Sequence, residues 1–213
     1  MLHTTEALIL RTYPLGESDR IVVFLTRDRG KRRGVAKNAR QSRRRFGGAL
    51  EPMTYGRVGY VEREGRDLVF LNYVEALRSP LMAVDGEALS YVGYFAELID
   101  QWAPDADPNE TMFRLGASMI DALAAGVPVE PLARYFEFWL LRIQGVYQSD
   151  PKASHEAKAF LQSARTCSPF ALTALTASAN TLRELEASHR VMMSMHLDRE
   201  LRSTKVLREM RRP

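Results

Sequence analysis

Residues 20–37, RIVVFLTRDRGKRRGVAK, are the stretch that decides the fold. The segment RIVVFLT (20–26) is rich in β formers and predicts a strand that is apolar on both faces. Asp28-Arg29-Gly30 is a turn signal, because glycine adopts positive φ without strain. KRRGVAK (31–37) then predicts a second strand with Lys31, Arg33, Val35 and Lys37 on one face and Arg32, Gly34 and Ala36 on the other. The stretch therefore predicts a β-hairpin whose second strand is strongly basic.

Three further strands are predicted on either side of this hairpin. They span residues 6–13, 54–62 and 67–75, and turn signals separate them. Five short strands in about 75 residues are typical of a small barrel, of which the OB-fold is the commonest five-stranded case. An SH3-like barrel fits the spacing nearly as well. Residues 39–52 form the long connection in which an OB-fold carries a helix or loop.

After residue 80 the apolar residues recur every three or four positions, which predicts helices. The segment 130–144 is apolar almost all round and predicts the central helix of a bundle. The other expected helices are 87–102, one that starts at Asp107-Pro108 with proline in its first position and stops at Gly126, 154–162, 169–180, 182–195 and 202–210. The sequence thus predicts an α+β chain, with an OB-fold nucleic-acid-binding domain at 1–80 and an α-helical domain at 81–213.

Composition excludes several classes of protein. Of the 213 residues, 46% are apolar and 26% are charged, which is typical of a soluble globular protein. No stretch approaches the ~18 uninterrupted apolar residues of a membrane span, and the N-terminus lacks the pattern of a secretory signal. We therefore expect a cytoplasmic protein.

Motifs for catalysis and metal binding are absent from the sequence. It contains no phosphate-binding glycine loop, nucleophile elbow or zinc-protease motif. The single cysteine, Cys167, is expected to be a small buried or half-buried residue, and the histidines are expected to be surface or partly buried imidazoles: His3, His155, His189 and His196. We expect a protein that is not an enzyme and holds neither a metal nor a cofactor.

Positive charge is concentrated in one segment. The net charge is only +4, yet residues 27–45 hold ten Lys and Arg against one Asp, while residues 81–137 hold ten acids against two Arg. Such a focused patch indicates a polyanionic partner. The candidates for contacts with a nucleic-acid backbone are Arg32, Arg33, Lys37, Arg40, Arg43, Arg44 and Arg45.

Aromatic residues accompany the basic segment. Phe46 lies within the basic loop, and Tyr13, Tyr55, Tyr60 and Tyr73 lie on or beside predicted strands. Aromatic side chains can stack on bases, but we expect these to be mainly core residues. Two other functions fit the charge pattern: an RNA-binding or ribosome-associated barrel, and a helical scaffold that binds an acidic protein through the basic loop.

A set of short motifs runs through both halves of the chain. The motifs are Glu6 to Thr12, Gly16 to Val22, Leu25-Thr26, Gly30-Lys31, Val35 to Lys37, Ala39-Arg40, Ser42-Arg43, Leu50 to Pro52, Ser90-Tyr91, Glu97-Leu98, Phe136-Glu137, Leu140-Leu141, Gly145, Leu201 to Ser203 and Val206-Leu207. In these motifs the sequence resembles the RecO family of bacterial recombination mediators, and the resemblance is specific in residues 1–52 and looser in the helical half. It implies an N-terminal OB-fold and a C-terminal helical domain.

The resemblance also implies a function without covalent chemistry. It implies binding of single- and double-stranded DNA, strand annealing, and help for RecA in replacing the single-stranded-DNA-binding protein SSB. The implied partners are RecR and the acidic C-terminal tail of SSB, with RecF and RecA engaged indirectly. We expect Arg134 and Arg142 to anchor that tail. Many members carry a four-cysteine zinc module after the segment that matches 140–145, and this chain has no such cysteines.

Overall fold

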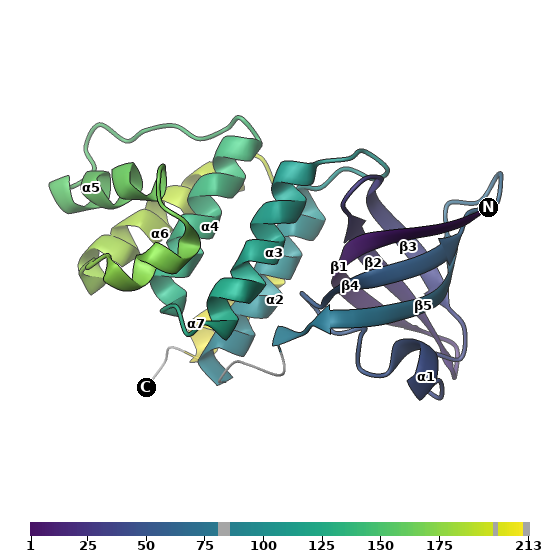
Figure 1. Ribbon diagram of the computed structural model, residues 1–213. Coiled ribbons are helices and arrows are strands. Elements are labelled where there is room, and N and C mark those ends of the chain that lie inside the picture. Colours follow the sequence, from purple (N-terminus) through teal and green to yellow (C-terminus); the bar gives the residue numbers. More distant parts are fainter. Residues whose placement is uncertain (81–85, 198–199, 211–213) are drawn as a thin grey trace.

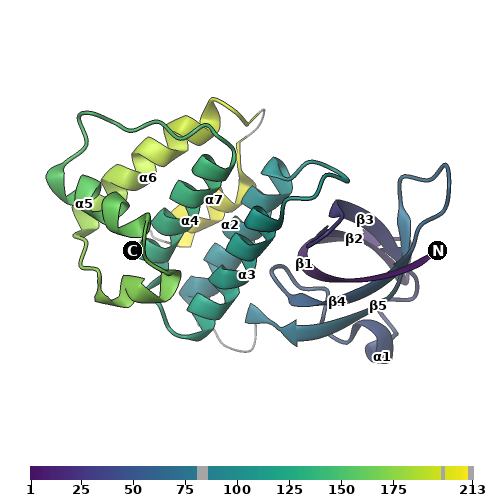
Figure 2. The same ribbon diagram turned by 45° about the horizontal axis from the view of Figure 1, so that its top comes forward.

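The chain forms a five-stranded barrel followed by a group of helices (Figure 1). The computed structural model describes residues 1–80, 86–197 and 200–210. Helices α2 (Gly86–Trp102) and α3 (Glu110–Ala124) lie between the barrel and the remaining helices in both Figure 1 and Figure 2. The helical half therefore meets the barrel through these two helices.

The barrel is closed, and its strands follow one another around it in the order β1-β2-β3-β5-β4. Only β3 and β5 pair in parallel among the adjacent strands. The short helix α1 (Arg43–Phe46) lies in the long connection between β3 and β4. This arrangement confirms the OB-fold expectation and excludes the SH3-like alternative. The strands are β1 (Leu2–Leu15), β2 (Asp19–Thr26), β3 (Gly30–Ala36), β4 (Tyr55–Val61) and β5 (Val69–Arg78).

Two hydrophobic cores explain why residues 20–26 are apolar on both faces. Inward-facing side chains such as Val22 and Phe24 fill the barrel. Their neighbours Val23 and Leu25 face outward and are buried in a second core, which the helices share. The outer face of this part of the barrel is thus covered by the helical half.

Helix α4 (Val129–Ile143) is the central helix, as the sequence predicts. It packs against α2, α3, α5 (His155–Ala164) and α6 (Ala179–Ser194). The last described helix, α7 (Arg202–Met210), packs against α2.

Several predicted bounds are wrong. Strand β1 spans Leu2–Leu15 rather than 6–13, and α6 starts at Ala179 rather than at 182. Helix α3 starts at Glu110 rather than at Pro108, because the side chain of Asn109 caps it by accepting a hydrogen bond from the Met112 amide at 2.9 Å. The helix predicted over 169–180 is a 3₁₀ helix, Pro169–Ala174, followed by extended chain. The extended chain ends at Ser178, which caps the start of α6: its hydroxyl accepts a hydrogen bond from the Thr181 amide at 3.2 Å.

Ion pairs join the basic barrel to the acidic segment of the helical half. Arg11 contacts Asp100 at 2.8 Å, Arg27 contacts Glu110 at 2.8 Å, and Arg78 contacts Asp121 at 2.8 Å. Much of the opposite charge that the sequence places in these two regions therefore meets at their interface.

The backbones of the two halves also meet directly, at Gly30. This residue has a φ of +70°, and a Cβ there would overlap the backbone of Asp107 in the α2–α3 loop. The nearby Lys31 carbonyl accepts a hydrogen bond from the Ala106 amide at 2.9 Å. The boundary predicted at residue 80 lies between the end of β5 and the start of α2, beside residues 81–85, which are outside the described residues; the division into two domains stays a prediction.

A carboxylate far away in the sequence caps the first turn of α7. The two oxygens of Glu97, on α2, accept hydrogen bonds from the amides of Arg202 at 3.0 Å and Ser203 at 2.7 Å. Burial alone would raise the pKa of Glu97, but the hydrogen bonds from Ser203 and Arg202 outweigh it and lower the pKa below 4.5. The ionised side chain thus holds α7 in place.

We expect Glu97→Gln to loosen α7 without unfolding the chain. A lost N-cap costs about 1 kcal/mol, so amide hydrogen exchange in 202–210 should accelerate roughly fivefold. In the wild type the cap is fully formed above pH 4.5 and is lost as the pH falls through the lowered pKa of Glu97. Glu209→Gln, which removes a charge from α7 itself, is the control. Unchanged exchange in Glu97→Gln would contradict the capping role.

Candidate nucleic-acid interface

The first half of the basic segment is neutralised by carboxylates. Arg27 contacts Glu6 at 3.1 Å as well as Glu110, and Arg29 lies 3.8 Å from Asp28. Lys31 lies 3.5 Å from both Asp100 and Asp105, and its ammonium group donates a hydrogen bond to the Asp100 carbonyl at 2.6 Å. These cations hold the fold together, and their field is largely cancelled.

Two of the predicted contact residues belong to this paired half. Arg33 is exposed but contacts Asp105 at 3.0 Å. Arg32 lies opposite Phe24 on the inner face of the barrel, is half-buried, and contacts Glu62 at 3.4 Å. Both charges are therefore paired with carboxylates. The sequence does not show these pairs, because only the tertiary fold brings the partners together.

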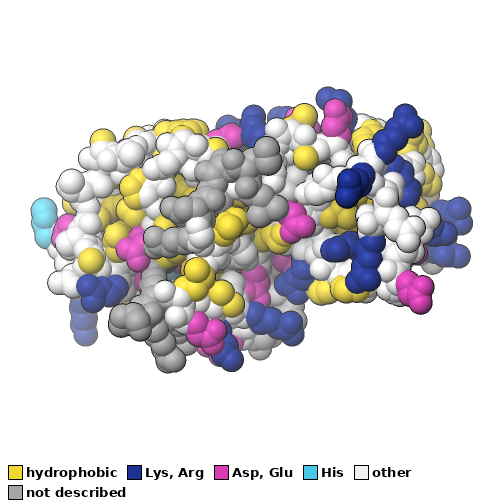
Figure 3. Space-filling view, turned by 90° about the horizontal axis from the view of Figure 1, so that it is seen from below, with side chains coloured by type: hydrophobic (Ala, Val, Ile, Leu, Met, Phe, Trp, Pro, Cys, Tyr) yellow, Lys and Arg dark blue, Asp and Glu magenta, His cyan; other side chains and the backbone are white. Residues whose placement is uncertain are grey.

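The second half of the segment carries charge that the described carboxylates do not neutralise. Within the described residues, no Asp or Glu lies within ion-pair distance of the five predicted contact residues that follow β3: Lys37, Arg40, Arg43, Arg44 and Arg45. Four of the five are exposed, and Arg45 is half-buried. We call these five residues the open basic loop. Figure 3 shows Lys and Arg side chains gathered over the barrel half of the molecule.

Hydrogen bonds hold the open basic loop in a defined shape. The Asn38 amide, at a φ of +52°, donates to Asp19 at 2.8 Å, and the Arg40 amide donates to the Ser18 carbonyl at 3.1 Å. Further along, Arg45 donates to the Lys37 carbonyl at 2.6 Å and lies over the ring of Phe46, which is buried in the barrel core. The loop is thus anchored at the β1–β2 turn and in the core, while its other four cations are exposed.

Most of the aromatic residues noted in the sequence are wholly or partly buried. Phe46 and Tyr60 are buried in the barrel core, and Tyr55 and Tyr73 are half-buried. Tyr13 is the exception, with 39% of its surface exposed. The expectation of a mainly structural role is correct for Phe46 and Tyr60.

Sequence reasoning missed an aromatic residue surrounded by cations. The Phe70 ring on β5 is half-buried, with the Arg63 guanidinium 4.8 Å, the Lys37 ammonium 5.7 Å and the Arg66 guanidinium 6.0 Å from its centroid. The sequence does contain a signal for the outward position of Phe70. Its neighbours Val69 and Leu71 face the barrel core, and successive residues of a strand face opposite sides.

In the helical half, the structure corrects the prediction for Arg134. This residue is only 3% exposed, and it contacts Glu137 at 2.7 Å and Glu186 at 3.2 Å. Burial alone would lower the pKa of Arg134, but the Glu137 carboxylate raises it, so the side chain stays charged. Arg134 is therefore part of a buried ion pair rather than an exposed anchor.

Other buried polar groups complete the surroundings of Glu137. The Tyr94 hydroxyl donates to Glu137 at 2.8 Å, and Nδ1 of His189 lies 3.0 Å from the same carboxylate. His189 is thus fully buried, contrary to the expectation of a surface or partly buried imidazole. We call Tyr94, Arg134, Glu137 and His189 the buried network.

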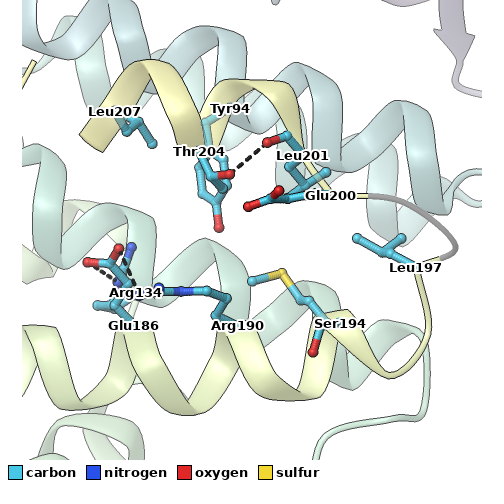
Figure 4. Close-up of a pocket in the computed structure, with 11 residues that line it drawn as sticks. Tyr94, Arg134, Glu186, Arg190, Ser194, Leu197, Glu200, Leu201, Thr204 and Leu207 are labelled. Carbon is cyan, nitrogen blue, oxygen red and sulfur yellow. Dashed lines mark hydrogen bonds and ion pairs between the residues drawn. The ribbon is translucent and has the colours of Figure 1, made fainter. Parts of the chain in front are cut away.

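Arg134 and Arg142 lie in different surroundings. Arg134 borders a cavity of about 80 Å³ between α6 and α7, whose apolar lining includes Met193, Leu201 and Leu207 (Figure 4). Arg142 is exposed, with its guanidinium 5.5 Å from the Phe138 ring centroid and 5.6 Å from that of Trp139. The structure therefore does not bring the two arginines into one peptide site.

The described residues contain no group of three metal-ligating side chains and no helix long and apolar enough to span a membrane. Cys167 is half-buried, as expected, and burial raises the pKa of its thiol. Whether the protein takes up zinc stays a prediction.

Comparison with known proteins covers both halves. Residues 1–80 match the family model for the N terminal part of recombination protein O, and residues 83–149 match the model for its C terminal part. A protein from Koribacter versatilis named DNA repair protein RecO is 46% identical over 146 residues, which are 68% of this chain and 59% of that relative. Proteins of the same name from Anaeromyxobacter sp. (strain K) and Pelotomaculum thermopropionicum are 42% and 30% identical, over 65% and 72% of this chain and 55% and 59% of their own lengths. The matched part thus makes up less than two thirds of these relatives.

Proposed function

Because the chain belongs to the RecO family, we propose that it acts in DNA repair by binding DNA, without covalent chemistry of its own. The observation that supports this most is the open basic loop, which presents cations without carboxylate partners among the described residues, beside an OB-fold. DNA binding by such a surface gains free energy from the release of counter-ions that the phosphates had condensed. A repair function also implies a cytoplasmic protein that joins the nucleoid during repair.

The open basic loop suits both single and double strands, because both present a phosphate backbone to its cations. A surface that screens two phosphate backbones at once lets complementary strands approach each other. We therefore propose strand annealing as part of the function, together with help for RecA in loading onto SSB-coated DNA. RecR is the proposed partner in that step, and RecF and RecA are engaged indirectly.

For the SSB tail, Arg142 is the better candidate of the two predicted arginines. Its charge is exposed, and the ring of Trp139 beside it is half-buried, whereas Phe138 is buried, so an acidic residue of the peptide is the part that Arg142 suits. The cavity beside Arg134 is less suitable, since Glu186 and Glu200 line it together with the cations. We propose that the tail contacts Arg142.

A salt titration of DNA affinity tests the proposed function. We expect log K to fall linearly with log salt, with about −0.9 per phosphate contact on duplex and about −0.7 on single strands. The same titration with A-form RNA and a strand-annealing assay separate the alternatives. Equal or tighter binding to RNA would favour an RNA-binding barrel, and no nucleic-acid affinity at physiological salt would favour a scaffold for an acidic protein.

A further inference from the structure

An uncovered row of apolar side chains crosses the outside of the barrel. Strand pairing places Tyr13 opposite Ile21, Ile21 opposite Val35, and Val35 opposite Phe70. The next residue on β2, Val22, faces the barrel core, so Ile21 and its partners face outward. We call Tyr13, Ile21, Val35 and Phe70 the outer row.

The outer row differs from the rest of that face in its exposure. Val23 and Leu25, two and four residues further along β2, also face outward but are buried against the helices. The four members of the outer row are exposed or half-buried. The row is therefore the part of this apolar face that the described helices leave uncovered.

Cations border the outer row at both ends. At one end the Arg11 guanidinium lies 5.6 Å from the Tyr13 ring centroid and donates a hydrogen bond to its hydroxyl at 2.7 Å, but Asp100 at 2.8 Å already neutralises this cation. At the other end Lys37, Arg63 and Arg66 surround Phe70. Glu64 and Asp67 lie in the same hairpin as Arg63 and Arg66, but no ion pair joins them to these cations among the described residues. Lys37 belongs to both the row's border and the open basic loop, so the two surfaces are continuous.

An aromatic ring bordered by cations is chemically complementary to a nucleotide. The ring stacks on the base, and the cations meet the phosphates on either side of it. In a duplex the face of each base is already stacked on its neighbours, so only an unpaired base can reach such a ring. An arginine that lies over the ring in the free protein can turn aside to contact a phosphate when a base arrives.

We propose that the outer row, with Phe70 as its principal residue, stacks the unpaired bases of single-stranded DNA. The inference rests on the proposed DNA-binding function and divides it between two surfaces. The open basic loop holds the backbone of either form, whereas the outer row adds affinity for single strands alone.

The test compares Phe70→Leu with a matched control on the same strand. Tyr73 is also a half-buried aromatic of β5, but no described cation lies over its ring, so Tyr73→Leu is the control. The probes are an oligothymidylate of about 16 nucleotides, the upper length that one OB-fold covers, and a duplex of the same length. Phe70→Leu should bind the oligothymidylate at least about fivefold more weakly, the low end for one stacked base, and the duplex equally well. Tyr73→Leu should leave both affinities unchanged.

A second variant keeps the inference testable if Phe70→Leu does not fold. Phe70→Trp retains a stacking ring, so it should keep the single-strand affinity, and its added fluorescence should be quenched by the oligothymidylate but not by the duplex. Equal losses on both probes in Phe70→Leu, or no loss, would overturn the stacking role while leaving the proposed function intact. If the wild type binds neither probe, the proposed function itself is wrong. Retained DNA affinity with no quenching in Phe70→Trp would also overturn the stacking role, because DNA would then bind without contacting the ring.

Discussion

Replacing Lys37, Arg43 and Arg44 together by alanine is expected to flatten the salt dependence of DNA binding by roughly 2 units. Each phosphate contact contributes about 0.7 to 0.9 to the slope of log K against log salt. These three cations have no carboxylate partner among the described residues and are exposed, so their full charge is available to phosphates. Salt titrations of the wild type and the variant on single strands and on duplex measure the difference.

The matched control removes three cations that are already paired. Arg29, Arg33 and Arg57 lie on the barrel surface and contact Asp28, Asp105 and Glu75. Their replacement by alanine changes the net charge equally, yet we expect the slope to change by much less, because carboxylates already neutralise them. Equal changes in the two variants would mean that only the net charge matters and that the open basic loop is not the contact surface. Arg45 is left intact, since it bonds to Lys37 and Ser42 within the loop.

Glu137→Ala is expected to lower the free energy of unfolding by about 3–5 kcal/mol, the usual cost of leaving a buried charge without its partner. Glu137 is 1% exposed and accepts hydrogen bonds from Arg134 and Tyr94 within the buried network. Its loss leaves the Arg134 guanidinium, which stays ionised, with only the more exposed Glu186. Urea denaturation measures the change.

Three further variants show whether the loss comes from the unpaired charge. The double replacement Arg134→Met with Glu137→Leu removes the charge together with its partner, so it should be less destabilising than Glu137→Leu alone. Asp121→Ala, which breaks the exposed pair with Arg78, should cost no more than ~1 kcal/mol. If the double variant is as unstable as the single one, cavity formation rather than charge explains the effect.

The sequence predicted the barrel well because each of its strands carries a local signal. The alternation in 31–37 and the apolar faces of 20–26 depend only on neighbouring residues. Two helix boundaries were predicted less well: Asn109 rather than Pro108 sets the start of α3, and Ser178 caps the start of α6 within a segment that was predicted to be one helix, 169–180. Which caps form depends on the chain's path through the tertiary structure.

The candidate site was predicted in part, because the sequence cannot show which charges are neutralised. Arg33 and Arg43 look alike within the basic segment, and nothing near either of them in the chain distinguishes the two. Arg33 nevertheless contacts Asp105, which is 72 residues away and reaches it only in the folded protein. The neutralised charges could therefore be separated from the open basic loop only once the tertiary structure was known.

Two other residues show where a signal was present and where it was not. The burial of Arg134 did have a local signal, since Arg134 and Glu137 are three residues apart in a stretch, 131–141, that is otherwise apolar. For Phe70 the alternation of β5 indicates an outward ring, but its contact with Lys37 depends on the parallel pairing of β3 with β5. That pairing is set by closure of the barrel rather than by neighbouring residues.

The ion pairs between the barrel and the acidic helices constrain how the chain can be altered. A barrel taken from another member of the family would meet Asp100, Glu110 and Asp121 with side chains of its own, and any neutral residue there would leave a carboxylate at the seam without its cation. The close approach at Gly30 adds a steric condition, because a side chain there meets backbone rather than a movable side chain. A chimaera that exchanges both sides of the seam together keeps these contacts, and one that exchanges a single half loses them.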